Sequence, residues 1–159
     1  MLDFIYQIVK SQKMKALSCT KKYSNIPIAH RAPFHDGHCA FIHGHNWSFS
    51  FTFEAINLDQ NGFVMDFGKL KALKAEIEKL DHACLIASND PMLALLQQMA
   101  NKGLLRLVIA KHGTSSESLA KQMLEVANEI VSEAENGRVI CTKVVVYEDE
   151  NNSATILNI

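Results

Sequence analysis

The chain has 159 residues, 48% of them hydrophobic, and this length predicts one domain, residues 1–159, with a core of its own. The formal net charge of −1 at pH 7 gives no general basic field, so the sequence predicts no binding to nucleic acid or to an anionic membrane. No apolar run approaches the roughly 20 residues of a membrane-spanning helix.

The N-terminal part is predicted to form an extension followed by two strands. Residues 1–14 carry an acid near the first residue and no small-residue cleavage site, which argues against a signal peptide. β-Branched and small residues over 17–32 predict a strand that ends near His30, and turn formers over 33–38 predict a loop. Aromatic residues alternate with small or polar ones over 42–55, which is typical of a strand with one buried face.

A turn and a helix are predicted next. The run Asp-Gln-Asn-Gly at 59–62 predicts a hairpin turn, with a return strand that begins at 63–65. Asp66 is a natural N-cap for a helix that continues to Leu80. The apolar stripe of this helix consists of Phe67, Leu70, Leu73, Ile77 and Leu80.

The C-terminal half is predicted to hold two more helices and three strands. Asp90-Pro91 opens a short helix, and Thr114 with Glu117 forms a capping-box pattern before a longer one. The longer helix is expected to bury Leu119, Met123, Val126 and Ile130. Strands are expected over 104–110, 138–147 and 153–159. Antiparallel strands interrupted by two main helices define the α+β class.

A metal site is predicted from His43-Gly44-His45. Histidines at i and i+2 on a strand point to the same face, with their ring nitrogens within reach of one ion. Gly44 between them permits close approach of a backbone or a ligand. His30, at the end of the preceding strand, is best placed to be the third ligand. Three neutral imidazoles with an open fourth position describe a catalytic zinc site.

Two alternatives remain open on spacing alone. A bare His-x-His pair is a short pattern, and it is also typical of a polar strand edge without a metal. His35, His38 and His112 compete with His30 as the third ligand, although all three fall in turn-rich segments where solvated histidines are common.

The cysteines divide into one candidate reactive thiol and three others. Cys39 lies four residues before His43, and a thiol beside a divalent cation has its thiolate favoured, which suits a base or a nucleophile. Cys19, Cys84 and Cys141 are interpreted as small buried hydrophobes, which is also the alternative for Cys39. The wide spacing, without a Cys-x-x-Cys pair, indicates reduced thiols and predicts a cytoplasmic protein.

Three acidic residues complete the candidates. Asp81 beside His82 can fix the imidazole tautomer for proton transfer, although both residues are equally suited to a solvated helix end. Glu148 ends an apolar strand and can accept two parallel N–H bonds from a guanidine-like ring edge, although such a residue is more often solvated. Glu117 is already explained as the capping-box acid.

In combination these segments resemble the 6-pyruvoyl-tetrahydropterin synthase and 6-carboxytetrahydropterin synthase family. The resemblance covers roughly residues 17–159, nearly the whole chain. It rests on the ordered motifs His30-Arg31, Cys39-x3-His43-Gly44-His45, Gly62-x3-Asp66-Phe67, Leu80-Asp81-His82, Thr114-Ser115-Ser116-Glu117 and Glu148.

The resemblance implies a fold and an assembly. The fold would be a tunnelling fold (T-fold), an antiparallel four-stranded sheet with two main helices on one face. Subunits would assemble as trimers stacked into a homohexamer, an oligomeric barrel with active sites at the subunit interfaces. Zn2+ would be bound by His30, His43 and His45.

The resemblance also implies a role for each reactive residue. Cys39 would be the general base, and His82, oriented by Asp81, would relay the proton. Glu148 would anchor the pterin ring through its amino-pyrimidinone edge. The segment that lines the pterin pocket would contribute Ser115, Ser116 and Glu117.

The implied substrate is 7,8-dihydroneopterin triphosphate. We favour a zinc-dependent lyase that releases triphosphate and acetaldehyde and leaves 6-carboxy-5,6,7,8-tetrahydropterin for the queuosine and deazapurine pathway. The reason is a base rate, because this branch is the more widespread in microbial cytoplasm. The alternatives are the pyruvoyl-forming sister enzyme and a non-catalytic pterin-binding homologue. Cys39 argues against the branch that carries glutamate in its place and forms 6-hydroxymethyl-dihydropterin.

The sequence departs from the family pattern in three places. The pocket motif reads Thr114-Ser115-Ser116-Glu117, without the usual proline and with a serine where a threonine methyl is usual. The segment 84–113 is longer than in compact members, and residues 1–14 have no counterpart.

Overall fold

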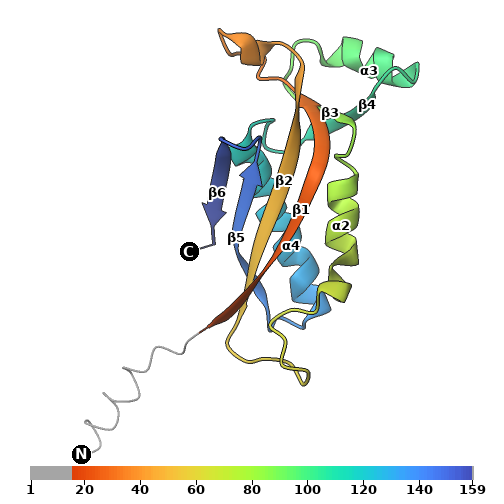
Figure 1. The fold of residues 1–159 in the computed structure, drawn as a ribbon. Helices are drawn as coiled ribbons and strands as arrows, with labels where there is room; N and C mark the ends of the chain where they lie inside the picture. The colour runs from red at the N-terminus through yellow and green to blue at the C-terminus, as the bar shows by residue number, and fades with distance from the viewer. Residues whose placement is uncertain (1–15, 159) are drawn as a thin grey trace, which may run out of the picture.

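The computed structural model describes residues 16–158, whose strands form one six-stranded sheet in the order β4-β3-β1-β2-β5-β6 (Figure 1). The strands are β1 (Leu17–His30), β2 (His43–Ala55), β3 (Ala83–Ala87), β4 (Arg106–Ala110), β5 (Ile140–Tyr147) and β6 (Ser153–Leu157). β2 pairs antiparallel with β1 and β5, and β5 pairs antiparallel with β6. β3 pairs parallel with β1 and β4. The predicted extension 1–14 and the end of the last strand at Ile159 lie outside the described residues.

The two helices of the main core, α2 (Lys71–Glu78) and α4 (Ser116–Ala134), cover one face of this sheet, and α3 (Leu93–Asn101) packs on the opposite face at β3. The other helical elements are η1 (His38–Ala40) and η2 (Phe67–Leu70). The main core joins α2 and α4 to the aromatic face of β2. A smaller cluster joins Leu96 of α3 to Cys84 and Ile86, which point to the opposite face of β3. Within residues 16–158, none of the helices is long and apolar enough to cross a membrane.

The aromatic face of β2 forms the centre of the core. Trp47, Phe49, Phe51 and Phe53 alternate along β2 and are fully buried, while the residues between them stay partly exposed. Partner strand β5 adds Val144 and Val146 and the buried thiol of Cys141 to the same face, and α4 adds a buried row. The period-2 pattern predicted for this segment is therefore confirmed. Its buried row lies against the two main helices.

The predicted four-stranded antiparallel sheet is wrong in detail. The strands β1, β2, β5 and β6 do form such a unit, but β3 and β4 extend it in parallel. The sequence pattern predicts no strand over Ala83–Ala87. The structure shows the reason: every residue of β3 is buried, so the strand lacks the alternation of polar and apolar residues that marks a half-exposed strand. Helices lie on both of its faces, which removes the polar half of the strand pattern. The α+β class holds.

The segment after β2 forms the predicted turn without the predicted return strand. Gly62, at φ 80°, donates its N–H to the Asp59 carbonyl, and the Asp59 carboxylate accepts the N–H groups of Asn61 and Phe63. The neighbouring residues Val64 and Met65 are buried in the core instead of pairing with β2, whose partners are β1 and β5.

The helix starts are partly as predicted. Asp66 caps its helix by accepting the Gly68 N–H, but Phe67 is exposed, unlike the rest of the predicted stripe. At α4 the N-cap is Ser115, which accepts from the Ser118 N–H, so the capping box predicted to begin at Thr114 is one residue out of register. Of the residues expected to be buried in α4, Leu119 and Met123 are buried, whereas Val126 and Ile130 are partly buried.

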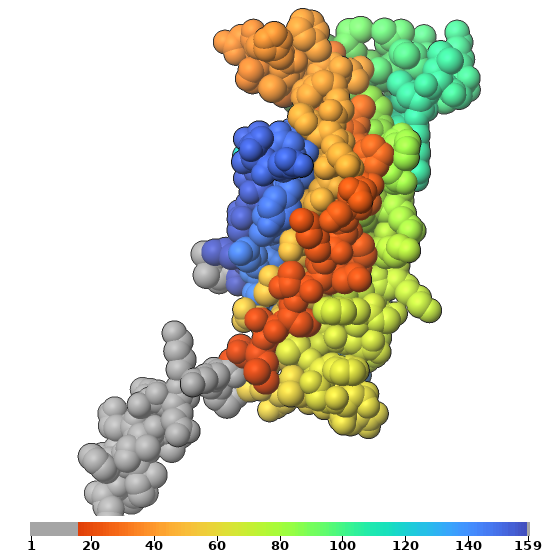
Figure 2. Space-filling model, viewed as in Figure 1, coloured from red at the N-terminus to blue at the C-terminus, as the bar shows by residue number. Residues whose placement is uncertain are grey.

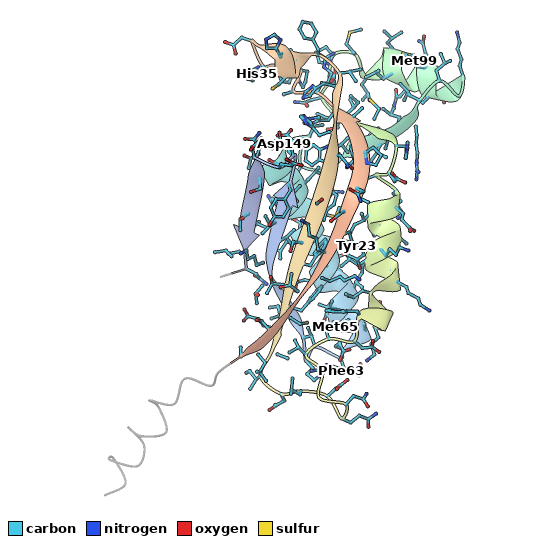
Figure 3. The ribbon with its side chains drawn as sticks, viewed as in Figure 1. Tyr23, His35, Phe63, Met65, Met99 and Asp149 are labelled. Carbon is cyan, nitrogen blue, oxygen red and sulfur yellow. The ribbon has the colours of Figure 1, made fainter. Side chains whose placement is uncertain are left out.

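Strand direction gathers many side chains of chemical interest at one end of the sheet. β1, β3, β4 and β5 all run the same way, so their carboxyl ends meet there with the start of β2. Figure 2 shows the loop after β1 and the α3 region as two lobes at this end. Figure 3 places His35 and Asp149 there, and Phe63 and Met65 at the opposite end.

A buried carboxylate ties the opposite end together. Glu135, at the end of α4, has a side chain only 4% exposed and pairs with Lys69 at 2.9 Å and with Arg138 at 2.5 Å. Burial raises the pKa of Glu135, and hydrogen bonds from the two cations lower it, with a net lowering. Arg138 also donates to the carbonyls of Asn57, Phe63 and Val64.

We expect Arg138→Ala to lower the free energy of unfolding by about 3 kcal/mol, because the variant leaves a buried charge with one partner and three carbonyls without their donor. Urea denaturation at a fixed protein concentration measures this loss. Arg106→Ala is the matched control, since Arg106 is exposed and donates to one carbonyl, that of Asp81. Equal losses in the two variants would contradict the role of Glu135.

Candidate metal centre and active site

Three histidines meet where β1 ends and β2 begins. His30 is the register partner of His43, and residues directly opposite in an antiparallel pair share a face. His45 lies two residues further along β2 and points to that face as well. The ring centroids are 4.5 Å apart for His30 and His43 and 5.1 Å apart for His43 and His45. The three rings therefore continue the buried row of β2 beyond Trp47, whose ring packs edge-on against His30.

Backbone carbonyls fix the orientation of two of these rings. His30 Nδ1 lies 2.9 Å from the Thr114 carbonyl oxygen, and His43 Nδ1 lies 2.8 Å from that of Phe41. A carbonyl only accepts, so both Nδ1 atoms carry the proton and both Nε2 atoms face the space between the rings. Such bonds set the tautomer that metal-binding histidines use.

Glu148 joins the histidines from β5. Its Oε1 lies 3.1 Å from His30 Nε2 and 3.6 Å from His45 Nε2. The four side chains each offer one ligand atom, and these atoms all lie within 4.8 Å of one another. The alternation of Val144 and Val146 on the buried face of β5 continues to Glu148, so periodicity was a signal for this placement that the sequence reasoning left unused.

The donor set fits a divalent transition metal. His30 Nε2 is buried and has no hydrogen-bond partner, although buried polar atoms are normally satisfied. Burial is the main cause that lowers the pKa of His30 below its ordinary 6.5, against the opposing effect of its bond to Thr114. A neutral imidazole is the ligand form, and three imidazoles with one carboxylate match the preferences of zinc.

Cys39 opens onto the same centre. It lies in η1, is exposed, and lines a cavity of about 490 Å³ together with His43, His45 and Glu148. The other cysteines are buried or half-buried, and burial raises the pKa of Cys141 to about 12. Among the described residues, Cys39 is thus the thiol that faces the histidine cluster.

Asp81 and His82 lie away from the histidine cluster in the structure. They precede β3, at the level of Pro27, whose carbonyl accepts the His82 N–H. Asp81 Oδ1 is 2.9 Å from His82 Nδ1, and the His82 side chain is 79% exposed. His82 also has φ 55°, in the left-handed region where a side chain is disfavoured. The pair is formed as predicted, but neither residue lines the Cys39 cavity.

The 114–117 segment supports the metal centre from behind and borders a second cavity. Thr114 is buried, and its hydroxyl donates to the Arg31 carbonyl at 2.6 Å while its own carbonyl holds His30. Thr114 and Ser115 line a cavity of about 470 Å³ beside the loop after β1. Ser116 and Glu117 line neither cavity, and hydrogen bonds from the Glu117 N–H and the neighbouring serine hydroxyls lower the Glu117 pKa.

The competing histidines have other partners or positions. His35 accepts the Gly37 N–H, and His112 Nε2 lies 3.0 Å from both carboxylate oxygens of Glu125. His38 lines the Cys39 cavity without joining the four-residue cluster. Gly44 is exposed, and a Cβ there would stand 3.6 Å from the Ile28 carbonyl, an ordinary contact, so packing within the chain does not require glycine at this position.

This chain matches the sequence model of a known protein family. The sequence model described as 6-pyruvoyl tetrahydropterin synthase matches residues 18–158. The chain belongs to the 6-pyruvoyl tetrahydropterin synthase family.

Relatives and solved structures agree with this assignment. The 6-carboxy-5,6,7,8-tetrahydropterin synthase of Aquifex aeolicus is 34% identical over 119 residues, 73% of this chain and 74% of the relative. The enzyme of that name from Rickettsia bellii is 27% identical over 85% of this chain and 96% of its own. An uncharacterized protein from Wolinella succinogenes has a TM-score of 0.79 at 22% identity, covering 91% of this chain and 99% of its own. The Caenorhabditis elegans 6-pyruvoyl tetrahydropterin synthase has a TM-score of 0.63 at 21% identity, covering 92% and 98%.

The lowered pKa of His30 predicts a pH dependence of stability. The unfolded chain binds more protons than the folded one below pH 6.5, so stability of the metal-free protein falls as pH falls from 6.5 toward the folded pKa. We expect His30→Gln to lose part of this dependence. Thermal unfolding of chelator-treated protein at about pH 7.5 and about pH 5.5 measures it. An unchanged pH response in the variant would contradict the assignment.

Proposed function

We propose that this chain is a zinc-dependent lyase that converts 7,8-dihydroneopterin triphosphate to 6-carboxy-5,6,7,8-tetrahydropterin, with release of acetaldehyde and triphosphate. The proposal rests chiefly on one observation, the orphaned Nε2 of His30 inside a cluster with His43, His45 and Glu148 that shares its cavity with Cys39. The names of the Aquifex and Rickettsia relatives support the carboxy-forming branch. The same proposal places the protein in the cytoplasm and its product in the queuosine and deazapurine pathway.

The three histidines would hold the zinc, and the other residues would handle protons and orientation. When bound, zinc supplies a Lewis acid that lowers the cost of negative charge on the side-chain oxygens of the substrate. Cys39, as the thiolate, would remove a carbon-bound proton and return one during the internal redox shift from side chain to ring. The carboxylate of Glu148 would accept two N–H groups from the amino-pyrimidinone edge and so fix the pterin ring.

The carbon count separates the two branches. The substrate side chain has three carbons, and the carboxy-forming reaction divides it into the one-carbon carboxylate and two-carbon acetaldehyde, with water as co-reactant. In the pyruvoyl-forming reaction all three carbons stay on the ring. The second branch is the alternative, favoured by the names of the Plasmodium vivax and Caenorhabditis elegans neighbours, which share the fold at TM-scores of 0.66 and 0.63.

His82 would act from a neighbouring copy of the chain. Its side chain is 79% exposed, it is held by Asp81, and within one chain it does not line the Cys39 cavity. An exposed acid–histidine pair on a left-handed residue is a costly arrangement that suits a site completed by assembly. We propose a homohexamer, a dimer of trimers, in which one copy supplies Cys39 and another supplies His82. Ser115, Ser116 and Glu117 would then border the pterin pocket at the same interface.

Product analysis tests the reaction. Zinc-loaded protein is incubated with 7,8-dihydroneopterin triphosphate, and mass spectrometry identifies the pterin and the aldehyde. Carboxytetrahydropterin with acetaldehyde is the expected result, and a pyruvoyl product without acetaldehyde would move the chain to the sister branch. Pterin binding without any new product would overturn catalysis and favour a pterin-binding homologue.

Removing one histidine should remove the metal and leave the fold. We expect His43→Ala to lose nearly all bound zinc and activity, with little change in circular dichroism, because a partly exposed strand end contributes little to the core. Metal analysis after dialysis gives the zinc content. His112→Gln, which removes a histidine paired with Glu125, is the control that should keep its zinc. Zinc retained by His43→Ala would contradict the assigned ligand set.

Complementation tests the shared site. Cys39→Ala and His82→Ala should each lower kcat by about 100-fold to 10,000-fold, as loss of a general acid or base does. If the two residues come from different copies, unfolding and refolding the two variants together should restore activity, since about a quarter of the sites in mixed oligomers carry both native side chains. No recovery in mixed oligomers would contradict a site shared between copies.

A further inference from the structure

The distances from Glu148 to His30 and His45 are close to those expected between two ligands of one ion. Zinc binds imidazole nitrogen and carboxylate oxygen at about 2.0–2.2 Å, so two such ligands in a tetrahedral site stand about 3.3–3.5 Å apart. Glu148 Oε1 lies 3.1 Å from His30 Nε2 and 3.6 Å from His45 Nε2, on either side of that value. The carboxylate oxygen therefore lies at a ligand-to-ligand distance from two of the three histidines and belongs to the same cluster as the third.

A hydrogen bond does not account for the closest of these contacts. His30 Nδ1 is bonded to the Thr114 carbonyl, and His30 Nε2 has no hydrogen-bond partner, despite the carboxylate oxygen 3.1 Å away. A carboxylate this close to a buried imidazole nitrogen would normally align with it as acceptor with donor. A cation bound by both the nitrogen and the oxygen would satisfy the two atoms.

We propose that Glu148 is the fourth metal ligand of the substrate-free site and that it leaves the metal when substrate binds. This inference rests on the proposed zinc and pterin chemistry and extends it, because the pterin anchor and the resting ligand become one side chain in two positions. In the exchange, a metal–carboxylate bond breaks and a bond to a substrate hydroxyl oxygen forms. Glu148 stays ionised and keeps its electron pair, which its freed oxygens offer to the ring N–H groups.

The surroundings of Glu148 permit a side-chain movement without a backbone movement. Its N–H donates to the Asn152 carbonyl at 3.0 Å, which holds the turn between β5 and β6. The side chain is 24% exposed and lines the cavity that holds Cys39. Rotation about its χ angles would let the carboxylate change partners inside this cavity. Glu148 would occupy the fourth coordination position, and so exclude other ligands from it, until a pterin ring attracts the carboxylate.

Zinc affinity tests the ligand role independently of turnover. We expect Glu148→Gln to bind zinc at least about 10-fold more weakly than the native chain in competition with a chromophoric chelator, since loss of even an outer partner of a ligand costs that much. Glu148→Asp, which keeps the charge and shortens its reach, should also weaken binding. Asp149→Asn is the matched control, because Asp149 lines the same cavity but its carboxylate is taken by Asn151 and Asn152 (Figure 3).

Cobalt substitution tests the exchange. The visible spectrum of the Co2+-loaded chain should shift when 7,8-dihydroneopterin is added, since this probe has the ring and the hydroxyls but no triphosphate to eliminate. The Glu148→Gln protein should differ from the native chain before the pterin is added. Native zinc affinity and native cobalt spectra in both Glu148 variants would overturn the inference while leaving the zinc enzyme intact. A native chain that binds neither metal would overturn the proposed function as well.

Discussion

The antiparallel register of β1 against β2 is the constraint on which the rest of the structure depends. It places His30 opposite His43 and keeps His45 on the face that carries Trp47 and the phenylalanines. Because side chains alternate with a period of two, a slip of one residue would turn the histidines and the aromatic row to the other face together. The strong preference of the aromatic row for burial therefore fixes which face of the sheet carries the histidine cluster.

Strand direction separates Asp81 and His82 from the other predicted reactive residues within one chain. The ends of β1 and β5 and the start of β2 meet at one end of the sheet, where His30, Glu148 and the Cys39 loop lie together. Asp81 and His82 come before β3, which runs parallel to β1, so they stand at the wrong end of their strand to join them. The exposure of this pair is consistent with a site completed between copies.

The metal centre lies at the boundary between core and solvent, and this position gives it its chemistry. His30 is buried beside Trp47, so its neutral form is favoured. The carbonyl of Thr114, just before α4, holds the proton on Nδ1 of His30, and the carbonyl of Phe41, just before β2, does the same for His43. Glu148 and Cys39 approach from the more open side. The cluster thus combines a buried imidazole whose tautomer is fixed with a carboxylate that borders an open cavity.

The sequence by itself determined the long strands, the N-cap at Asp66 and the family, because these features follow from local patterns and from the order of the motifs along the chain. It left open whether Asp81 pairs with His82, which the structure shows. It left the third histidine open among four, and only the pairing of β1 with β2 selected His30 for the cluster. Tertiary structure also decided that residues 83–87 form the strand β3, because a strand buried on both faces shows no alternation of polar and apolar residues. The approach of Glu148 to the histidines was likewise decided in three dimensions, because β5 reaches β2 across more than 80 residues of chain and only their register brings the two ends together.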